Sequence, residues 1–396
     1  LFSMLSFWNQ IENMQLQGKL FVLEHQLEPM SKKLKMKKDR MLRDEAASAS
    51  LVLPKEKLEE CIPKIDHQSV NIGNYTFRSP AFEDKLLQTL DPKVHTVFDA
   101  WLKTLFYHGK SKAFAYRRLL PSGKRAKEFT WITYSEAENW ISQITSGILN
   151  LNIPTGQMGL LSENRVEWQL VNLALARLKR HILVPLEPKL RDEDLQFVLQ
   201  DSNAHTLFVS AKYLEKALTL CQQKSLNVKN FICLDELSDE QRAFVSNPIY
   251  AEFNVFLLMD LFNSGHSSPR TDFEHPSGQD LYLINYTSGT SGNPKGVMIT
   301  HSNLIATTAS LRLLWKGLSK AGPQTYLSFL PLSHVLQLVS EQVMMEFGFP
   351  IGYWSDDLKK LTEDVKLFSP TIMASVPRVL QVMEGKMKHG VHQKNF

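Results

Sequence analysis

Cysteines, long apolar runs and net charge are all scarce in this sequence, and each shortage argues against a class of protein. Among 396 residues there are three cysteines, Cys61, Cys221 and Cys233, with wide spacing and no Cys-x-x-Cys or paired histidine pattern. Such spacing is typical of reduced, buried thiols in an intracellular protein. We therefore expect neither a disulfide framework nor a zinc site.

No apolar run is long enough to cross a membrane. Residues 253–262 form one of the longest runs, and Asp260 interrupts it, whereas a membrane-spanning helix needs about 20 apolar residues. Any membrane contact should therefore be peripheral. The formal net charge of +4 is small for this length and argues against a nucleic-acid partner. The hydrophobic share of 43% is ample for a sizeable core, in one domain or more.

The first fifty residues differ in composition from the rest. A basic cluster at 32–38 lies between an apolar beginning and the small-residue stretch 46–50. A polybasic patch can bind acidic lipid headgroups, with about 1 kcal/mol per residue close to the surface. A solvated helical tail without a partner is the alternative that we favour. We expect residues 1–76 to form a basic leader that is poorly ordered or helical.

From residue 77 onward, strand-like and helix-like segments alternate. The pattern predicts helices at 96–106, 135–149 (capped by Ser135), 166–178, 192–200 and from 211, and strands at 129–134, 158–161, 182–186, 205–209 and 231–234. Residues 248–279 are rich in Ser, Pro and His and predict a surface connection.

The alternation resumes after this connection. Strands are predicted at 281–284, 297–299, 326–330 and 371–375, and helices at 303–315, 335–347 and 357–367. Strands that alternate with helices of this length favour an α/β fold with mostly parallel sheets covered by helices.

Residues 286–296, Tyr-Thr-Ser-Gly-Thr-Ser-Gly-Asn-Pro-Lys-Gly, lie between two of the predicted strands. Three glycines give the backbone freedom to turn its N–H groups toward an anion, four hydroxyl side chains add donors, and a lysine adds positive charge. This composition predicts a phosphate-binding loop. A surface hairpin is the alternative. The P-loop of nucleotidases is excluded, because Pro294-Lys295-Gly296 stands where that motif needs Gly-Lys-Ser/Thr.

This loop, followed by Thr300-His301, resembles the hallmark of the adenylate-forming superfamily of acyl-CoA synthetases, peptide-synthetase adenylation domains and luciferases. Further segments are similar to the long-chain fatty acid–CoA ligase branch: 163–168, 184–186, 330–334 and 375–379. The resemblance extends from about residue 95 to about residue 385. It implies that residues 77–396 are an incomplete large N-terminal AMP-binding domain of such an enzyme.

The resemblance implies two half-reactions. A long-chain fatty carboxylate attacks the α-phosphate of ATP to give acyl-adenylate and pyrophosphate, and the thiolate of coenzyme A then displaces AMP. The residues that it implies for ATP and phosphate binding are Thr287, Ser288, Gly289, Thr290, Ser291, Gly292 and Lys295. Mg²⁺ would neutralise the same phosphate oxygens. We assign no metal ligands to the protein.

His334 is the catalytic candidate, since the matching segment of the family places this ring beside the acyl carbonyl and the adenylate. A polar cap at a helix start is the alternative role for such a histidine. Many members of the branch carry an acid three positions later, where this chain has Gln337; its nearest downstream acid is Glu341. The following apolar residues are expected to pack in the core rather than line an acyl tunnel: Val335, Leu336, Leu338, Val339 and Met344.

Later elements of the family do not occur in these 396 residues: a Tyr-Gly-x-Thr-Glu motif, a ribose-binding aspartate, a hinge and a small C-terminal domain with a lysine. We therefore expect the 396-residue chain alone to be poorly stable and inactive, and the full-length parent to be a ligase. Another adenylate-forming ligase with an aryl or carrier-protein acceptor, and a non-catalytic truncated isoform, remain alternatives. The resemblance implies a place in the cytoplasm or peripherally on the endoplasmic reticulum or peroxisome.

Overall fold

The computed structural model does not describe the whole chain. The described residues are 70–71, 77–78, 86–120, 124–287, 292–315, 317–318, 322–377 and 379–381. The chain divides into residues 1–81 and 82–396. Of the first part, the structure describes strands β1 (Val70–Asn71) and β2 (Phe77–Arg78), which pair antiparallel. The rest of the expected basic leader lies outside the described residues, so its character remains a prediction.

The main element of residues 82–396 is a seven-stranded sheet with the order β11-β10-β6-β5-β7-β8-β9. Its strands are β5 (Gly156–Leu161), β6 (His181–Leu186), β7 (Thr206–Val209), β8 (Asn230–Cys233), β9 (Asn254–Leu257), β10 (Leu281–Thr287) and β11 (Lys295–Thr300). Each neighbouring pair is parallel except β10 and β11. The segment β6-β5-β7-β8-β9 has the order of a doubly wound α/β fold.

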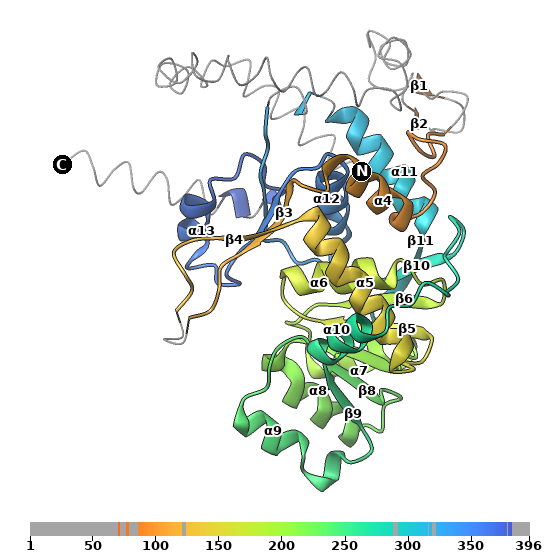
Figure 1. The fold of residues 1–396 in the computed structure, drawn as a ribbon, viewed down its shortest axis with the longest axis vertical. Coiled ribbons are helices and arrows are strands. Elements are labelled where there is room, and N and C mark those ends of the chain that lie inside the picture. The colour runs from red at the N-terminus through yellow and green to blue at the C-terminus, as the bar shows by residue number, and fades with distance from the viewer. Residues whose placement is uncertain are drawn as a thin grey trace, which may run out of the picture. The chain divides into compact units, whose positions relative to one another are not determined.

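Helices cover both faces of this sheet (Figure 1). Strand residues alternate between two cores: Leu160 of β5 packs in one and Leu161 in the other. The first core includes residues of α5 (Tyr134–Asn150), α6 (Val166–Leu175) and α10 (Leu258–Ser267). The second includes residues of α7 (Asp192–Asp201), α8 (Ala211–Gln223) and, at its margin, α9 (Asp239–Val245). The predicted α/β fold with mostly parallel sheets is therefore confirmed.

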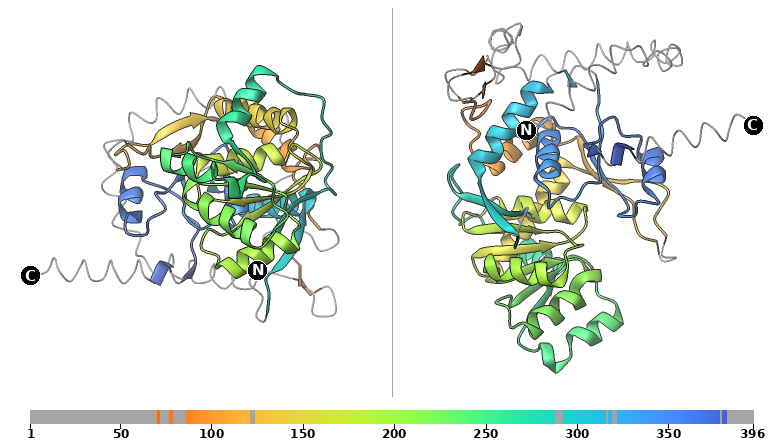
Figure 2. Two further views of the ribbon diagram at one scale, coloured as in Figure 1. Left: turned by 90° about the horizontal axis from the view of Figure 1, so that it is seen from below. Right: turned by 180° about the vertical axis from the view of Figure 1, so that it is seen from behind.

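A second sheet has four strands in the order β12-β13-β3-β4, seen from two further directions in Figure 2. Its strands are β3 (Lys112–Tyr116), β4 (Thr130–Thr133), β12 (Tyr326–Ser328) and β13 (Ile351–Tyr353). The remaining α-helices of the described residues are α4 (Val97–His108), α11 (His301–Leu314), α12 (Val335–Glu346) and α13 (Leu361–Phe368). Arg117, directly after β3, pairs with Asp364 of α13 at 2.7 Å, and both side chains are buried. This ion pair attaches α13 to the second sheet.

Several predicted boundaries differ from the observed ones. Thr133, rather than Ser135, caps α5, because its hydroxyl accepts the N–H of Glu136 while the Glu136 carboxylate accepts the N–H of Thr133. Helix α6 ends at Leu175 and not at 178, and α13 begins at Leu361 instead of 357. The strand predicted at 371–375 is reduced to a single bridge between Ile372 and Tyr326.

The largest error concerns residues 248–279, which were expected to be a surface connection. They contain β9, the edge strand of the main sheet, and α10, which packs on α5. The contact is between backbones: a Cβ atom on Gly265 would lie 1.9 Å from the carbonyl oxygen of Gln143, and one on Gly147 would lie 2.0 Å from that of Leu261. Gly265, which weakens the helix signal in the sequence, is thus what allows α10 to approach α5.

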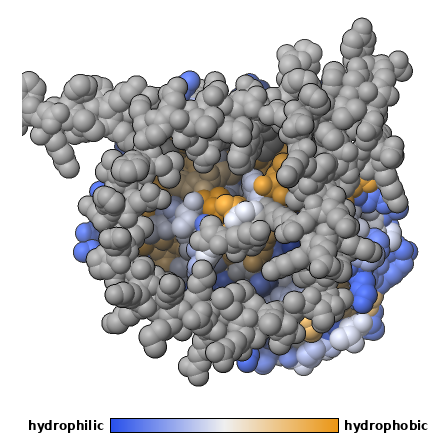
Figure 3. Space-filling model, turned by 90° about the horizontal axis from the view of Figure 1, so that it is seen from above, coloured by the Kyte–Doolittle hydropathy of each residue, from blue (hydrophilic) through white to orange (hydrophobic). Residues whose placement is uncertain are grey.

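Two observations on the described residues bear on expectations from composition. Cys221 and Cys233 are buried free thiols, and burial raises their pKa to about 12 and about 11. Cys61 lies outside the described residues. Within the part that the structure describes, no helix has the length and apolarity to span a bilayer. Some apolar side chains are nevertheless exposed, among them Phe106, Met298 and Leu314, and Figure 3 shows orange side chains on the face that it draws.

We predict that Gly265→Ala destabilises the full-length protein by about 1–3 kcal/mol, the usual cost of overpacking, because the added methyl group meets backbone that cannot rotate away. Urea unfolding followed by circular dichroism measures the change. Gly317→Ala is the matched control, since a Cβ atom at that position meets nothing within 4 Å. Equal stabilities of the two variants would contradict the proposed close contact.

Candidate functional site

Strands β10 and β11 form the two arms of the hairpin that carries the predicted phosphate loop. Thr287, the last residue of β10, pairs with Lys295, the first residue of β11, so the two strands predicted around the loop are confirmed. Both residues are exposed, as is Gly292, which has φ +96°. Ser288, Gly289, Thr290 and Ser291 lie outside the described residues, and their part in phosphate binding remains a prediction.

The described ends of the loop, Thr287 and Lys295, lie at the carboxyl end of β10. Because β10 is parallel to β6 and β6 is parallel to β5, the ends of these three strands lie at the same edge. In open α/β sheets, ligands bind outside the carboxyl ends of the strands. Asn164 follows β5 and Glu187 follows β6 at this edge, while Asn285 lies near the end of β10.

These three residues hold residues 330–334, which we call the anchored segment. The Asn164 amide donates to the carbonyl oxygen of Leu330 at 2.6 Å and accepts the N–H of Leu332 at 2.9 Å. The amide of Asn285 donates to the carbonyl oxygen of Ser333 at 3.0 Å. In addition, the hydroxyl of Ser333 donates to Glu187 at 2.8 Å. The segment that carries His334 is thus fixed from three neighbouring parallel strands.

His334 ends the anchored segment and is the N-cap residue of α12. Its side chain makes no capping hydrogen bond, and the residue is exposed. The alternative of a polar helix cap is therefore not supported. The structure brings His334 and the β10 end of the loop to the same edge, because Asn285 lies two residues before Thr287 and bonds the residue before His334. The catalytic role of His334 itself remains a prediction.

Behind His334, α12 buries a polar network against β12 and β13. Gln337 donates to Glu341 at 2.8 Å and to Ser328 at 3.1 Å, and it accepts from the hydroxyl of Tyr326 at 2.9 Å. The hydroxyl of Tyr353 donates to the other oxygen of Glu341 at 3.0 Å. Glu341 is fully buried. Burial raises its pKa to about 7, although hydrogen bonds from Ser328, Gln337 and Tyr353 act in the opposite direction.

The same network explains the role of Gln337, which stands where many members of the long-chain branch carry an acid. Ser328 joins the network to the anchored segment, because its hydroxyl also accepts from Asn164 at 2.8 Å. Gln337 is therefore a structural link between α12 and β12, and the acid behind the site is Glu341. Of the five apolar residues of α12 that were expected in the core, Leu338, Val339 and Met344 are buried there and Leu336 is partly buried. The expectation is wrong for Val335, which is 48% exposed in the first turn of the helix.

Thr300 and His301, part of the sequence hallmark, have structural roles. The Thr300 hydroxyl accepts the N–H of Asn303 and caps α11. Nδ1 of buried His301 accepts the N–H of Val97, the first residue of α4, at 3.2 Å. Burial lowers the pKa of His301 to about 4, so the ring is neutral and can accept this bond near pH 7. This pair connects α11 to α4.

A second polar cluster lies at the carboxyl ends of the parallel neighbours β5 and β7, the point where the strand order of the sheet switches from one side of β5 to the other. The hydroxyls of Ser162 and Ser210 are 2.7 Å apart, and Ser210 donates to Glu163 at 2.9 Å. Lys212 pairs with Glu163 at 3.3 Å and with Asp356 at 2.8 Å. Asp356 follows β13 of the second sheet, so this cluster links the two sheets.

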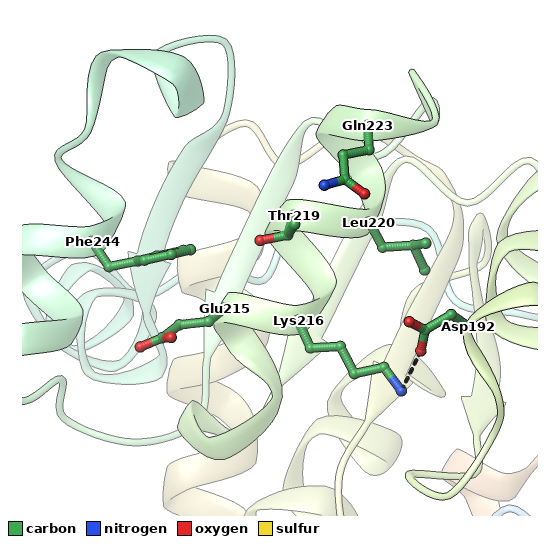
Figure 4. A pocket seen from close by; sticks show the side chains of 7 residues that line it. All are labelled: Asp192, Glu215, Lys216, Thr219, Leu220, Gln223 and Phe244. Atoms are coloured by element: carbon green, nitrogen blue, oxygen red, sulfur yellow. Dashed lines mark ion pairs between the residues drawn. The ribbon is translucent and has the colours of Figure 1, made fainter.

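An open pocket of about 250 Å³ lies between α7, α8 and α9, and Figure 4 shows seven of its side chains. Lys216 points toward Asp192, with which it forms a 2.7 Å ion pair. No lining residue belongs to the loop or to the anchored segment. We assign this pocket no part in the site. Among the described residues, no group of three or more His, Cys, Asp or Glu side chains could hold a metal ion.

Asn164, Glu187 and Asn285 were not identified as site residues from the sequence. Asn164 stands in one of the segments that carry the family resemblance, but no role was evident for it. The available signal was polarity in an apolar setting: Asn285 interrupts the strand-forming run 281–286, and a buried amide needs a partner. The partner, Ser333, is 48 residues away, so the sequence alone did not indicate it.

Comparison with known proteins decides the family. A family model described as AMP-binding enzyme matches residues 108–395. The chain belongs to this family. It is 31% identical to fatty acyl-CoA synthetase B of Dictyostelium discoideum over 314 residues, which are 78% of this chain and 45% of the relative. It is 30% identical to acyl-CoA ligase 891, peroxisomal, of Penicillium roqueforti, over 82% of this chain and 48% of the relative.

Solved structures of adenylate-forming enzymes share the fold of this AMP-binding chain. The adenylation domain of a carboxylate reductase from Mycobacterium chelonae has a TM-score of 0.64 at 19% identity, covering 91% of this chain and 54% of that one. A long-chain fatty acid–CoA ligase from Archaeoglobus fulgidus has a TM-score of 0.59 at 22% identity, covering 77% and 56%. The chain spans about half the length of the curated relatives it matches, and the resemblance seen in its motifs is confirmed.

Because the folded state holds the Glu341 proton more tightly than the unfolded chain does, the stability that this group contributes is complete below about pH 4.5 and declines as the pH rises to about 7. We predict that Glu341→Gln, which mimics the protonated acid, gains stability relative to the wild-type protein across this interval. A pKa shift from 4.5 to about 7 corresponds to about 3 kcal/mol.

The measurement is denaturant unfolding of both proteins between pH 4.5 and 8. Glu346→Gln is the control for replacing an acid on the same helix, since Glu346 lies outside the Glu341 network and pairs with Arg312. If the stability difference between Glu341→Gln and the wild-type protein does not change with pH, the carboxyl does not titrate in this range.

Proposed function

We propose that the full-length protein activates a long-chain fatty acid with ATP to form acyl-adenylate and then transfers the acyl group to coenzyme A. The observation that supports this most is the meeting of the phosphate-loop hairpin and the anchored segment at one sheet edge through Asn285. Relatives named fatty acyl-CoA synthetase and acyl-CoA ligase support a fatty acid as the substrate and coenzyme A as the acceptor of the acyl group. Several relatives named peroxisomal support an intracellular place, in the cytoplasm or peripherally on an organelle.

The chemistry requires positioning and charge stabilisation more than covalent help from the protein. In the proposal, Thr287, Gly292, Lys295 and residues 288–291 hold the β- and γ-phosphates. The leaving pyrophosphate thus develops its charge against N–H groups, hydroxyls and the ammonium of Lys295. The products of this step are the mixed anhydride and pyrophosphate, and AMP is a far better leaving group than oxide in the transfer that follows.

His334 would lie beside the acyl carbonyl and the adenylate. Its position fits this role, because the side chain makes no capping hydrogen bond to α12 and the backbone around it is fixed by the anchored segment. Mg²⁺ would accompany the nucleotide and neutralise phosphate oxygens. Mg²⁺ in such sites is commonly held by substrate phosphates, waters and one or two carboxylates.

The direct test is ATP–pyrophosphate exchange by the full-length protein with palmitate, octanoate, benzoate and phenylalanine, followed by thioester formation with coenzyme A. We expect exchange with palmitate and a palmitoyl thioester in the second step. Exchange only with benzoate or phenylalanine would indicate another adenylate-forming ligase. Absence of exchange with all four acids would contradict the proposal.

Lys295→Ala should lower kcat/KM for ATP by roughly tenfold to a hundredfold, since the loop loses its charge at the departing pyrophosphate. Lys295→Arg should restore part of this loss, because it keeps the charge but not the compact ammonium. Lys229→Ala is the control: this lysine precedes β8, at the opposite edge of the sheet, and pairs with Glu252. Equal losses in both alanine variants would place Lys295 outside the site.

His334→Ala should lower kcat of the adenylation step by about tenfold or more, while the free energy of unfolding changes by less than about 0.5 kcal/mol, as for surface substitutions without special contacts. The exposed ring without a capping bond is the physical reason for the second expectation. Single-turnover formation of acyl-adenylate and urea unfolding measure the two effects. A stability loss that accounts for the activity loss would show a structural histidine instead.

A further inference from the structure

We propose that Asn285 is a positioning residue that sets the phosphate loop and His334 in their mutual geometry. The inference rests on the proposed function and adds to it a residue that links the two parts of the site. Asn285 is not a catalytic residue in this proposal, because it acts through the backbone of Ser333.

The first argument is burial. Asn285 is 5% exposed and follows Leu283 and Ile284, which are buried in the cores on the two faces of the sheet. An amide in such a place costs free energy unless it is hydrogen-bonded. The partner of its N–H group is the carbonyl oxygen of Ser333 at 3.0 Å. The bond joins two segments that are 48 residues apart in the sequence.

The second argument is the rigidity of the strand that carries Asn285. Strand β10 pairs with β6 on one side and with β11 on the other, and the Tyr286 hydroxyl adds a 2.6 Å bond to Asp201 of α7. Asn285 therefore has a fixed backbone. Thr287, two residues later, begins the phosphate loop. The hydrogen bond from Asn285 therefore fixes the position of Ser333, and of the adjacent His334, relative to β10, the strand that leads into the loop.

The third argument distinguishes Asn285 from the other anchors. Asn164 follows β5 and Glu187 follows β6, so neither lies on the strand that leads into the loop. The single residue Asn164 makes three hydrogen bonds, two to Leu330 and Leu332 of the anchored segment and one to Ser328 before it. The anchored segment would therefore stay folded without Asn285, but no direct hydrogen bond from β10 would fix its position relative to the loop.

The consequence is a loss in the chemical step more than in nucleotide binding. ATP would still meet the intact loop, while the acyl group beside His334 would lie out of line with the α-phosphate. Small misplacements of reacting groups can cost up to about a hundredfold in rate. Asn285→Asp is the sharpest change: the shape is kept, but a carboxylate oxygen replaces the donor and faces the carbonyl oxygen of Ser333.

The experiment compares the full-length wild-type protein with Asn285→Ala and Asn285→Asp in ATP–pyrophosphate exchange with palmitate. We expect kcat to fall about tenfold or more in both variants, with the larger loss for Asn285→Asp, and KM for ATP to change less than about threefold. Asn150→Ala is the matched control, since its amide also donates to backbone carbonyls, those of Ser264 and Ser268, in the α5–α10 contact. Its kcat should remain within about twofold of the wild-type value.

Two results would overturn the inference while leaving the proposed function intact: wild-type exchange with unchanged kcat in both Asn285 variants, or parallel changes in kcat and KM. An absence of exchange in the wild-type protein with every fatty acid would overturn the proposed function, and this inference with it. If Asn285→Ala does not fold, the isosteric Asn285→Asp variant decides, with its kcat corrected for the folded fraction measured by circular dichroism.

Discussion

The candidate site of this protein depends on hydrogen bonds between side chains at the carboxyl edge of a parallel sheet and the backbone of residues 330–334. Loops at such an edge come from strands that may be far apart in the sequence, and only contacts between them fix their relative positions. Here the amides of Asn164 and Asn285 make these contacts. An amide has both a donor and an acceptor, which suits it to bind exposed backbone groups of a segment without regular structure. Without these bonds, the phosphate loop and His334 would be independent features.

The parts of the fold that the sequence predicted well are those with an unambiguous hydrophobic pattern. Strands such as β6 and, up to Ile284, β10 are buried on both faces and read as apolar runs, and the helices between them show clear periodicity. Strands β3, β9 and β13 were missed. Strand β13 has three residues, one of them Gly352, whose lack of a side chain accommodates the ring of Phe368; a Cβ atom there would lie 2.3 Å from it. Tertiary packing decided this strand, and its local sequence carried no signal.

The same distinction applies to the site. The loop was evident from its composition because glycines, hydroxyls and a lysine in a short stretch have a direct chemical meaning. His334 was identified through its motif, and the structure added that its ring has no capping role. The anchors were not predicted, because Asn164 and Glu187 look like ordinary loop residues until their partners are known. The network behind the site is a further example: Glu341 lies seven residues after His334, and its burial between α12 and β13 follows from the fold alone.

The contact between α5 and α10 has a consequence for local unfolding. At Gly147 and Gly265 the two helix backbones meet without intervening side chains, so no rotamer change can loosen the contact gradually. Helix α10 directly follows β9, the strand at one edge of the main sheet. Regions joined in this way open together, as one cooperative unit. The amide hydrogens of β9, α10 and the facing turns of α5 should consequently share one opening free energy, so that this margin of the sheet exchanges as a block instead of fraying strand by strand.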